Sequence, residues 1–127
     1  MQLKMQDIIG FSTFYDAVKN QKLSMKTAYR LAQLARAADG EIVFYREKFQ
    51  EIVRRYGELD EHGNPIPTAK GDGVKLRPGT EQDCYQAMAE LQNLEVEMPD
   101  ITFTIDDFSN VELTTTEIHA IMPFIVE

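Results

Sequence analysis

The sequence predicts an α+β fold in one domain, residues 1–127: a long central helix in an antiparallel helical layer, with a small β-sheet and a C-terminal helix. Three observations support this prediction. Apolar residues recur at helical spacing across residues 24–57, residues 58–79 are rich in Gly and Pro, and beyond residue 94 the apolar spacing changes to alternation. A chain of 127 residues has the usual size of one domain. It can bury a core without disulfides or metal.

The first twenty residues are expected to form a short strand and then a short helix. Residues 2–6 alternate between apolar and polar side chains, with Leu3 and Met5 on one side, which is a strand pattern. The following residues place aromatic and aliphatic side chains at helical spacing, which predicts a helix to about Asn20. Those residues are Phe11, Phe14, Tyr15 and Val18.

The long helix, residues 24–57, carries the strongest pattern in the chain. It begins at Ser24, a residue type favoured at the N-cap. Its apolar residues alternate steps of three and four, the register of a helix that packs along one seam: Ala28, Leu31, Ala35, Ala38, Ile42, Tyr45, Phe49, Ile52 and Tyr56. This register continues through Asp39-Gly40, although Gly costs about 1 kcal/mol relative to Ala in a helix. We therefore expect one continuous helix, roughly 50 Å long, and no turn at Asp39-Gly40. The residues expected to be buried are Leu31, Ile42, Phe49 and Ile52.

The helix is expected to end at Gly57, in the left-handed conformation that commonly follows a helix. Arg54 and Arg55 fall in the last turn, where cations interact favourably with the helix dipole. Residues 58–79 then form a flexible, turn-rich loop. The residues expected to form a small ribbon within it are Ile66, Val74 and Leu76.

A second helix is expected at residues 80–94, antiparallel to the second half of the long helix. Thr80 is the expected N-cap, and Glu81 and Asp83 follow in the first turn, where acidic residues are favourable. The apolar residues step by three, four and three, which predicts one buried face: Cys84, Ala87, Leu91 and Leu94.

Residues 95–127 are expected to form strand, turn, strand and helix. Alternation after residue 94 predicts a strand, and residues 111–113 are expected to pair with it. The inward residues of the strand are expected to be Val96, Met98, Ile101, Phe103 and Ile105. Thr114 and Glu117 have the spacing of a capping box, and Pro123 should end or kink the helix that follows. The apolar face expected for that helix consists of Ile118, Ile121, Met122 and Ile125.

No segment of the chain has the pattern of a catalytic, cofactor or metal site. Residues 60–64 fail as a calcium loop, because the central Gly and the twelfth-position Glu are misplaced. The two histidines, His62 and His119, form no zinc motif, and Cys84 has no activating neighbour. Residues 71–79 lack the glycine and lysine positions of phosphate-binding loops. We therefore expect a protein that is not an enzyme and holds no cofactor.

Charge is distributed unevenly along the chain, whose net charge is −8. Residues 1–57 hold ten Lys and Arg against six Asp and Glu, whereas residues 58–127 hold three against fifteen. After Arg77, eleven acidic residues follow without a Lys or Arg. Such asymmetry affects partners and solubility rather than fold. Two interpretations remain open: the acidic part pairs with basic residues of the same molecule or oligomer, or it engages a basic partner. The candidate partner-binding residues are Glu95, Glu97, Asp106, Asp107 and Glu112.

Neither a membrane nor nucleic acid is an expected partner. No window is apolar enough to span a membrane, and the N-terminal residues lack the form of a signal peptide. The net charge and the sequence pI of 4.7 oppose direct nucleic-acid binding. The basic residues that would have to provide such binding are Lys19, Lys22, Lys26 and Arg30.

Three segments of the chain resemble short acidic proteins of unknown function encoded by tailed phages of Gram-positive bacteria. They are "RRYGELDEHGNPI" at 54–66, "LQNLEVEMPDITF" at 91–103 and "LTTTEIHAIMPFIVE" at 113–127. The resemblance implies a phage origin and a non-enzymatic role, in the host cytoplasm or associated with the virion. It assigns no site residue.

Two functions are compatible with these observations. The first is a phage protein-interaction or assembly protein, acting through its helical layer and acidic C-terminal half and forming a homo-oligomer through the helical seam. The alternative is a phage inhibitor of a host defence or nucleic-acid-processing complex, whose acidic surface mimics a phosphate backbone. Both functions need a protein partner, from the host or the phage.

Overall fold

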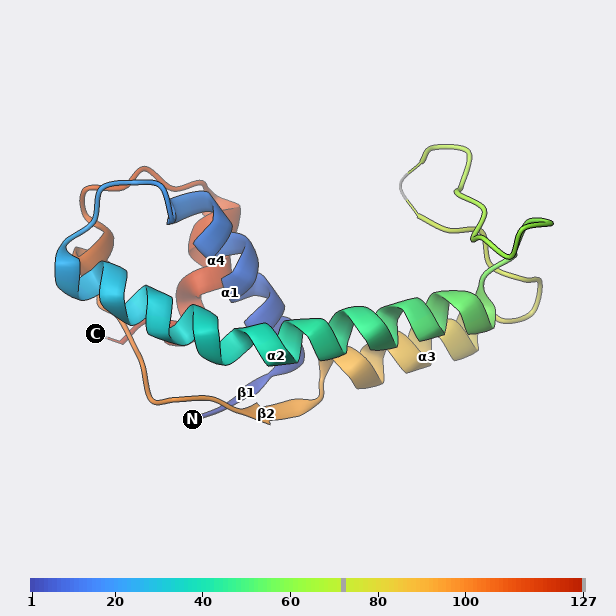
Figure 1. Cartoon of the computed structure of the whole chain (residues 1–127), viewed down its shortest axis with the longest axis horizontal. Coiled ribbons are helices and arrows are strands. Elements are labelled where there is room, and N and C mark those ends of the chain that lie inside the picture. Colours follow the sequence, from blue (N-terminus) through green and yellow to red (C-terminus); the bar gives the residue numbers. More distant parts are fainter. Residues whose placement is uncertain (72, 127) are drawn as a thin grey trace. The chain divides into compact units, whose positions relative to one another are not determined.

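A computed structural model describes residues 1–71 and 73–126 (Figure 1). Two residues lie outside the described ones: Asp72 in the predicted loop and Glu127 at the end of the predicted C-terminal segment. The elements in chain order are β1 Gln2–Lys4, α1 Met5–Val18, α2 Met25–Tyr56, α3 Glu81–Gln92, β2 Glu95–Glu97, the 3-10 turn η1 Ile105–Phe108, α4 Thr115–Ile121 and the 3-10 turn η2 Met122–Phe124. The α+β class is therefore confirmed in outline. Two compact units form, one from residues 1–42 and 95–127 and the other from residues 43–94.

Helix α2 is continuous, as the apolar register predicted, and no reversal occurs at Asp39-Gly40. Ser24 caps it, since its hydroxyl oxygen accepts a hydrogen bond from the Thr27 amide at 3.2 Å. The buried seam in its first half differs from the predicted one. Leu31 and Ala38 are buried as expected, but Ala28 is exposed. The seam consists of Thr27, Leu31, Leu34 and Ala38, again at steps of four, three and four.

The core of the first unit is a cluster of phenylalanines brought together from distant parts of the chain. Phe11 of α1 lies 5.2 Å from Phe124, between ring centroids, and Phe14 lies 5.3 Å from Phe108. Phe103 and Phe108 are 5.4 Å apart. These rings are nearly or fully buried, so they hold α1, η1 and η2 to one another. Helix α4 packs beside α1 (Figure 1).

The predicted sheet is smaller than expected. Strands β1 and β2 pair antiparallel, with Leu3 opposite Val96. Beyond β2 the strand does not continue: Phe103 makes a parallel bridge to Ile125 instead. Residues 111–113 form no strand, so the expected second pairing is wrong. Pro99 provides no amide hydrogen to continue the ladder, and the chain turns into η1 shortly afterwards.

Residues near the C-terminus follow their local signals more closely than their predicted burial. Thr114 and Glu117 form the expected capping box, because the Glu117 amide donates to the Thr114 hydroxyl at 3.1 Å and the Thr114 amide donates to the Glu117 carboxylate at 3.0 Å. Helix α4 ends before Pro123, as predicted. Of the predicted apolar face, Ile121 is buried but Ile118 and Met122 are exposed. Phe124 takes the buried position instead.

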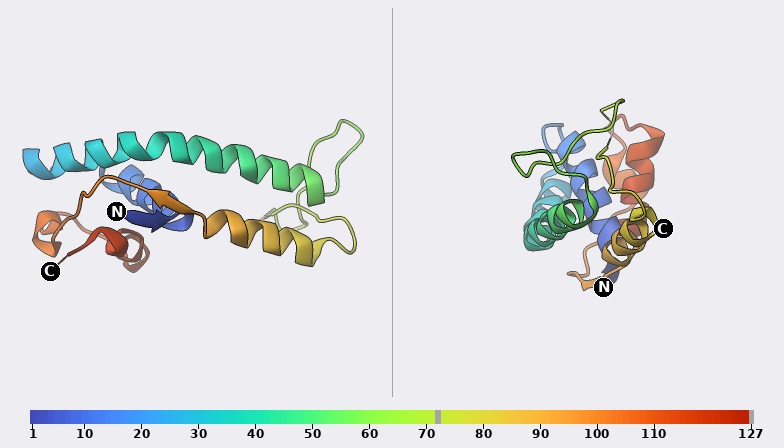
Figure 2. Two further views of the ribbon diagram at one scale, coloured as in Figure 1. Left: turned by 90° about the horizontal axis from the view of Figure 1, so that it is seen from below. Right: turned by 90° about the vertical axis from the view of Figure 1, so that its right-hand side faces the viewer.

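The second unit is a helical hairpin. Helix α3 runs antiparallel to the second half of α2, as predicted (Figures 1 and 2). The two helices are joined by residues 57–80, in which three short segments bridge one another: Gly57 with Leu76, Leu59 with Pro65, and Pro67 with Val74. The expected ribbon of Ile66, Val74 and Leu76 is thus present.

Three backbone hydrogen bonds close a ring at the centre of this ribbon. The Glu58 amide donates to the Lys75 carbonyl at 2.8 Å, and the Lys75 amide donates to the Ile66 carbonyl at 2.8 Å. The Ile66 amide donates to the Glu58 carbonyl at 3.0 Å. Each segment therefore pairs with the other two. The ring fixes the points where the chain leaves α2 and approaches α3.

The two ends of the connection differ from their predicted caps. Gly57 does not adopt a positive φ, so it is not a left-handed cap. It is required for another reason: a Cβ at this position would overlap the Val53 carbonyl oxygen. Thr80 precedes α3, but its hydroxyl donates to the carbonyl oxygens of Arg77 at 2.6 Å and Tyr56 at 3.2 Å, rather than capping α3.

Candidate interaction surface

The helical hairpin leaves most of its large apolar side chains accessible to solvent. Leu91 is its buried aliphatic residue. Phe49, expected to be buried, is 41% exposed, and Ile42 and Ile52 are half-buried. The exposed apolar residues of this unit are Val43, Phe44, Phe49, Leu59, Tyr85 and Leu94. A helix buries its apolar stripe against other elements, and two helices alone leave part of each stripe uncovered.

An open groove runs between α2 and α3, which we call the α2/α3 groove. Its volume is about 840 Å³, within the usual range for binding sites in proteins. The apolar part of its lining consists of Phe44, Ile52, Tyr56, Ala87, Leu91 and Leu94. The charged part consists of Lys48, Glu51, Arg54, Arg55, Arg77 and Glu90. The groove therefore combines an apolar surface with more basic than acidic groups.

The basic character of the groove is concentrated in three arginines. Lys48 is already engaged, because its ammonium group lies 3.2 Å from the Glu51 carboxylate and above the Phe44 ring. Arg54, Arg55 and Arg77 have no carboxylate within 4.0 Å among residues 1–71 and 73–126. A guanidinium group pairs with carboxylates through two parallel hydrogen bonds. This part of the groove is thus equipped to accept acidic groups.

The ribbon brings these arginines together. Arg54 and Arg55 end α2, whereas Arg77 lies more than twenty residues later in the chain. The Arg77 amide donates to the Tyr56 carbonyl at 2.9 Å, which places Arg77 beside the end of α2. The sequence indicates only a favourable interaction of Arg54 and Arg55 with the helix dipole. The pairing of Gly57 with Leu76 was the missing information, and the ribbon pattern was its only signal.

A second, smaller hollow of about 310 Å³ lies on α2. Tyr45 and Phe49 stack there with ring centroids 6.1 Å apart, and Arg46 and Gln50 complete the lining. The two aromatic rings extend the exposed apolar surface of the hairpin beyond the α2/α3 groove. Aromatic side chains contribute strongly to protein interfaces.

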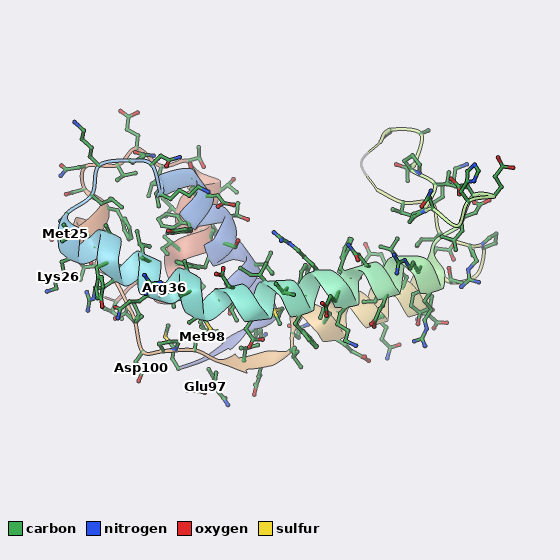
Figure 3. The ribbon with its side chains drawn as sticks, in the orientation of Figure 1. Met25, Lys26, Arg36, Glu97, Met98 and Asp100 are labelled. Carbon is green, nitrogen blue, oxygen red and sulfur yellow. The ribbon has the colours of Figure 1, made fainter. Side chains whose placement is uncertain are left out.

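Two of the predicted acidic residues lie on β2. Glu95 and Glu97 flank the buried Val96 and share the exposed face of the strand, as expected from its alternation. Glu97 is not free, because the Met1 amino group lies 3.1 Å from its carboxylate and 2.7 Å from that of Asp100 (Figure 3 labels both acids). The hydrogen bonds that this amino group donates to Asp100, and then to Glu97, raise its pKa.

The other predicted acidic residues lie on two further segments. Asp107 has a structural role, because its carboxylate accepts a hydrogen bond from the Thr104 amide at 2.8 Å and caps η1. Asp106 is exposed on the same turn, next to the exposed Ile105. Glu112 is exposed in the irregular stretch before α4. The five acids therefore belong to β2, η1 and this stretch rather than to one element.

The remaining candidate chemistry of the sequence has structural explanations. The Asp60 carboxylate accepts hydrogen bonds from the amides of His62 at 2.8 Å and Asn64 at 2.9 Å, which stabilises a turn. Cys84 is a half-buried free thiol on α3, and His119 is exposed on α4. Within the described part of the chain, no three His, Cys, Asp or Glu side chains gather as metal ligands would.

Comparison with known proteins adds no relative: the chain matches no family model, no curated protein and no solved structure. Among the helices of residues 1–71 and 73–126, none combines the length and apolarity needed to cross a bilayer.

Proposed function

We propose that this chain is a phage-encoded, non-enzymatic interaction or assembly protein that acts through its helical layer and its acidic C-terminal half. The observation that carries the proposal is the uncovered apolar surface of the helical hairpin. The phage origin rests on the resemblance of three sequence segments to phage proteins. A protein of this kind functions in the host cytoplasm or on the virion.

The energetics of the hairpin favour a partner. Burial of apolar surface contributes roughly 25 cal/mol per Å², so covering Phe44, Phe49 and Leu94 would stabilise the hairpin and the complex together. A stable interface buries on the order of 1,000 Å² or more, which requires a surface larger than one groove. The α2/α3 groove and the Tyr45–Phe49 hollow both lie on the hairpin and would form part of such a surface, together with the exposed residues around them.

The non-enzymatic part of the proposal has positive support. Three carboxylates are engaged in holding the backbone: Asp60 in a turn, Asp107 at the start of η1 and Glu117 at the start of α4. These three carboxylates have the partners of structural caps.

The alternative, inhibition by acidic mimicry, has one observation in its favour. Glu95 and Glu97 share an exposed strand face, as neighbouring phosphates would. The mimicry alternative is weaker because two of its acids are already engaged. Glu97 pairs with the Met1 amino group, and Asp107 accepts a hydrogen bond from the Thr104 amide. Neighbouring genes in the genome of origin discriminate between the two functions: structural genes favour assembly, whereas early accessory genes favour inhibition.

The proposal is tested by finding the partner in cells infected with the phage that carries the gene. An affinity-tagged chain is cross-linked in those cells, and the recovered partner is then purified and titrated against variants. We expect Phe49→Gln to weaken binding by about tenfold or more. The matched control, Met25→Gln, changes a residue that is 85% exposed at the start of α2, in the other unit, and should leave binding unchanged (Figure 3). Absence of a saturable partner, or equal effects of both variants, would overturn the proposal.

A further inference from the structure

The turn η1 presents an apolar residue beside an acidic one on a rigid support. Ile105 is 70% exposed and Asp106 is exposed next to it. The same turn is fixed at both ends: Asp107 caps its start, and Phe108 is buried in the phenylalanine cluster. A group held in place before binding loses little conformational freedom when it binds. Ile105 is therefore preorganised as a protrusion.

A single exposed isoleucine is ordinary on a protein surface. Ile105 is of interest because the same chain contains a site, the α2/α3 groove, that is complementary to Ile105 and Asp106. The α2/α3 groove has an apolar lining and three arginines without carboxylate partners in the described residues. Ile105 would occupy the apolar part while Asp106 faces the arginines. A groove of about 840 Å³ has room for a whole turn of chain rather than one side chain.

We propose that η1 of one copy docks into the α2/α3 groove of a second copy, so that copies associate head to tail. The proposal rests on the interaction function proposed above and names its partner as this chain itself. Charge complementarity supports a second copy as the occupant, because Arg54, Arg55 and Arg77 line the groove, whereas η1 carries Asp106 and no Lys or Arg follows Arg77 in the chain. Complementary charge on different surfaces brings copies together in one orientation.

Such a contact has a defined symmetry. The two surfaces that meet are different, so each copy retains one free groove and one free turn after pairing. Contacts of this type continue into rings or open filaments instead of closing as a two-fold dimer. Growth into rings or filaments suits an assembly protein. It also distinguishes this contact from a two-fold dimer, which stops at two copies.

The test uses two full-length variants and sedimentation velocity. The groove variant, Arg54→Gln with Arg55→Gln, removes two charges while keeping residues with similar helix propensity. The turn variant, Ile105→Asp, changes an exposed side chain, so the fold should be retained and is checked by circular dichroism. We expect the unmodified chain to associate with increasing concentration, and each variant alone to associate about tenfold or more weakly. Met25→Gln is the matched control and should associate like the unmodified chain.

The decisive sample is an equimolar mixture of the two variants. The groove variant still has an intact turn, and the turn variant still has an intact groove, so the mixture should form heterodimers and nothing larger. Association of the unmodified chain should weaken as salt is raised, because salt screens charge pairs at an accessible groove. The groove variant should show a smaller dependence on salt.

Three results would overturn the inference: a chain that is monomeric up to its solubility limit, variants that associate normally, or a mixture that remains monomeric. The first two leave the proposed function standing if Phe49→Gln still weakens binding to a foreign partner. The third shows that an intact turn and an intact groove on different copies do not meet, and it leaves the proposed function standing on the same condition. The failure of this inference can therefore be distinguished from failure of the interaction function itself.

Discussion

Gly40 offers a direct test of the continuous helix α2. It lies in the interior of the helix and is exposed, and a Cβ placed on it would have no atom within 4 Å. Gly40→Ala therefore adds no clash and removes only the conformational freedom of glycine in the unfolded chain. The expected gain in the free energy of unfolding is about 1 kcal/mol. For a chain of this size, that corresponds to a rise in Tm of roughly 3–6 °C.

The assay is urea and thermal unfolding followed by far-UV circular dichroism. Gly57→Ala is the matched comparison, because its Cβ would overlap the Val53 carbonyl oxygen and approach Val74. It should be destabilising, since backbone atoms must move to make room. If Gly40→Ala were neutral or destabilising, the helix would not continue through Asp39-Gly40, and the assignment of α2 would be wrong. If Gly57→Ala were tolerated, the close approach of Gly57 to Val53 would be wrong.

Three further predictions concern the core, pH and metal. Phe14→Ala should lower the free energy of unfolding by about 3–5 kcal/mol, because Phe14 is fully buried. Phe49→Ala should lower it by only about 1–2 kcal/mol in dilute protein, because much of the Phe49 ring is exposed. Equal losses for the two variants in urea titrations would contradict this. The raised pKa of the Met1 amino group implies a stabilisation that is complete below about pH 8 and is lost as pH rises through the raised pKa. Asp100→Asn should flatten that part of the curve of stability against pH. An unchanged curve would argue against the contact between the Met1 amino group and Asp100. Chelator should leave the Tm unchanged, because the Asp60 carboxylate is occupied by two backbone amides; a shift of several degrees would reveal a bound metal.

Local signals were the most reliable guide to the fold. The register of α2 and the capping box of α4 both depend on residues within a few positions of one another, and both were predicted. The buried seam of α2 was placed less accurately. A helical stripe is wider than one seam, and packing selected Thr27 and Leu34 where the sequence pattern favoured Ala28 and Ala35.

Features that depend on long-range pairing were not predictable in the same way. The alternation that suggested an inward Ile105 continues past Pro99, but the chain turns into η1 and buries Phe108 instead. The groove arginines meet only because the three-segment ribbon pairs Gly57 with Leu76. Phe49 was expected to be buried because its position fits the seam, yet packing among the described residues leaves 41% of it exposed.

Photo-cross-linking from Ile105 can show whether η1 of one copy lies in the α2/α3 groove of another. A photoreactive amino acid replaces Ile105, and the fold should tolerate this change because the side chain is exposed. The variant is then mixed with isotope-labelled unmodified chain, so that mass spectrometry can recognise links between copies. We expect links from position 105 of one copy to the segments of the other that contain the lining residues of the α2/α3 groove: residues 44–56, Arg77 and residues 87–94. Links between copies that fall only outside these segments, or no links between copies at concentrations where the chain associates, would contradict it.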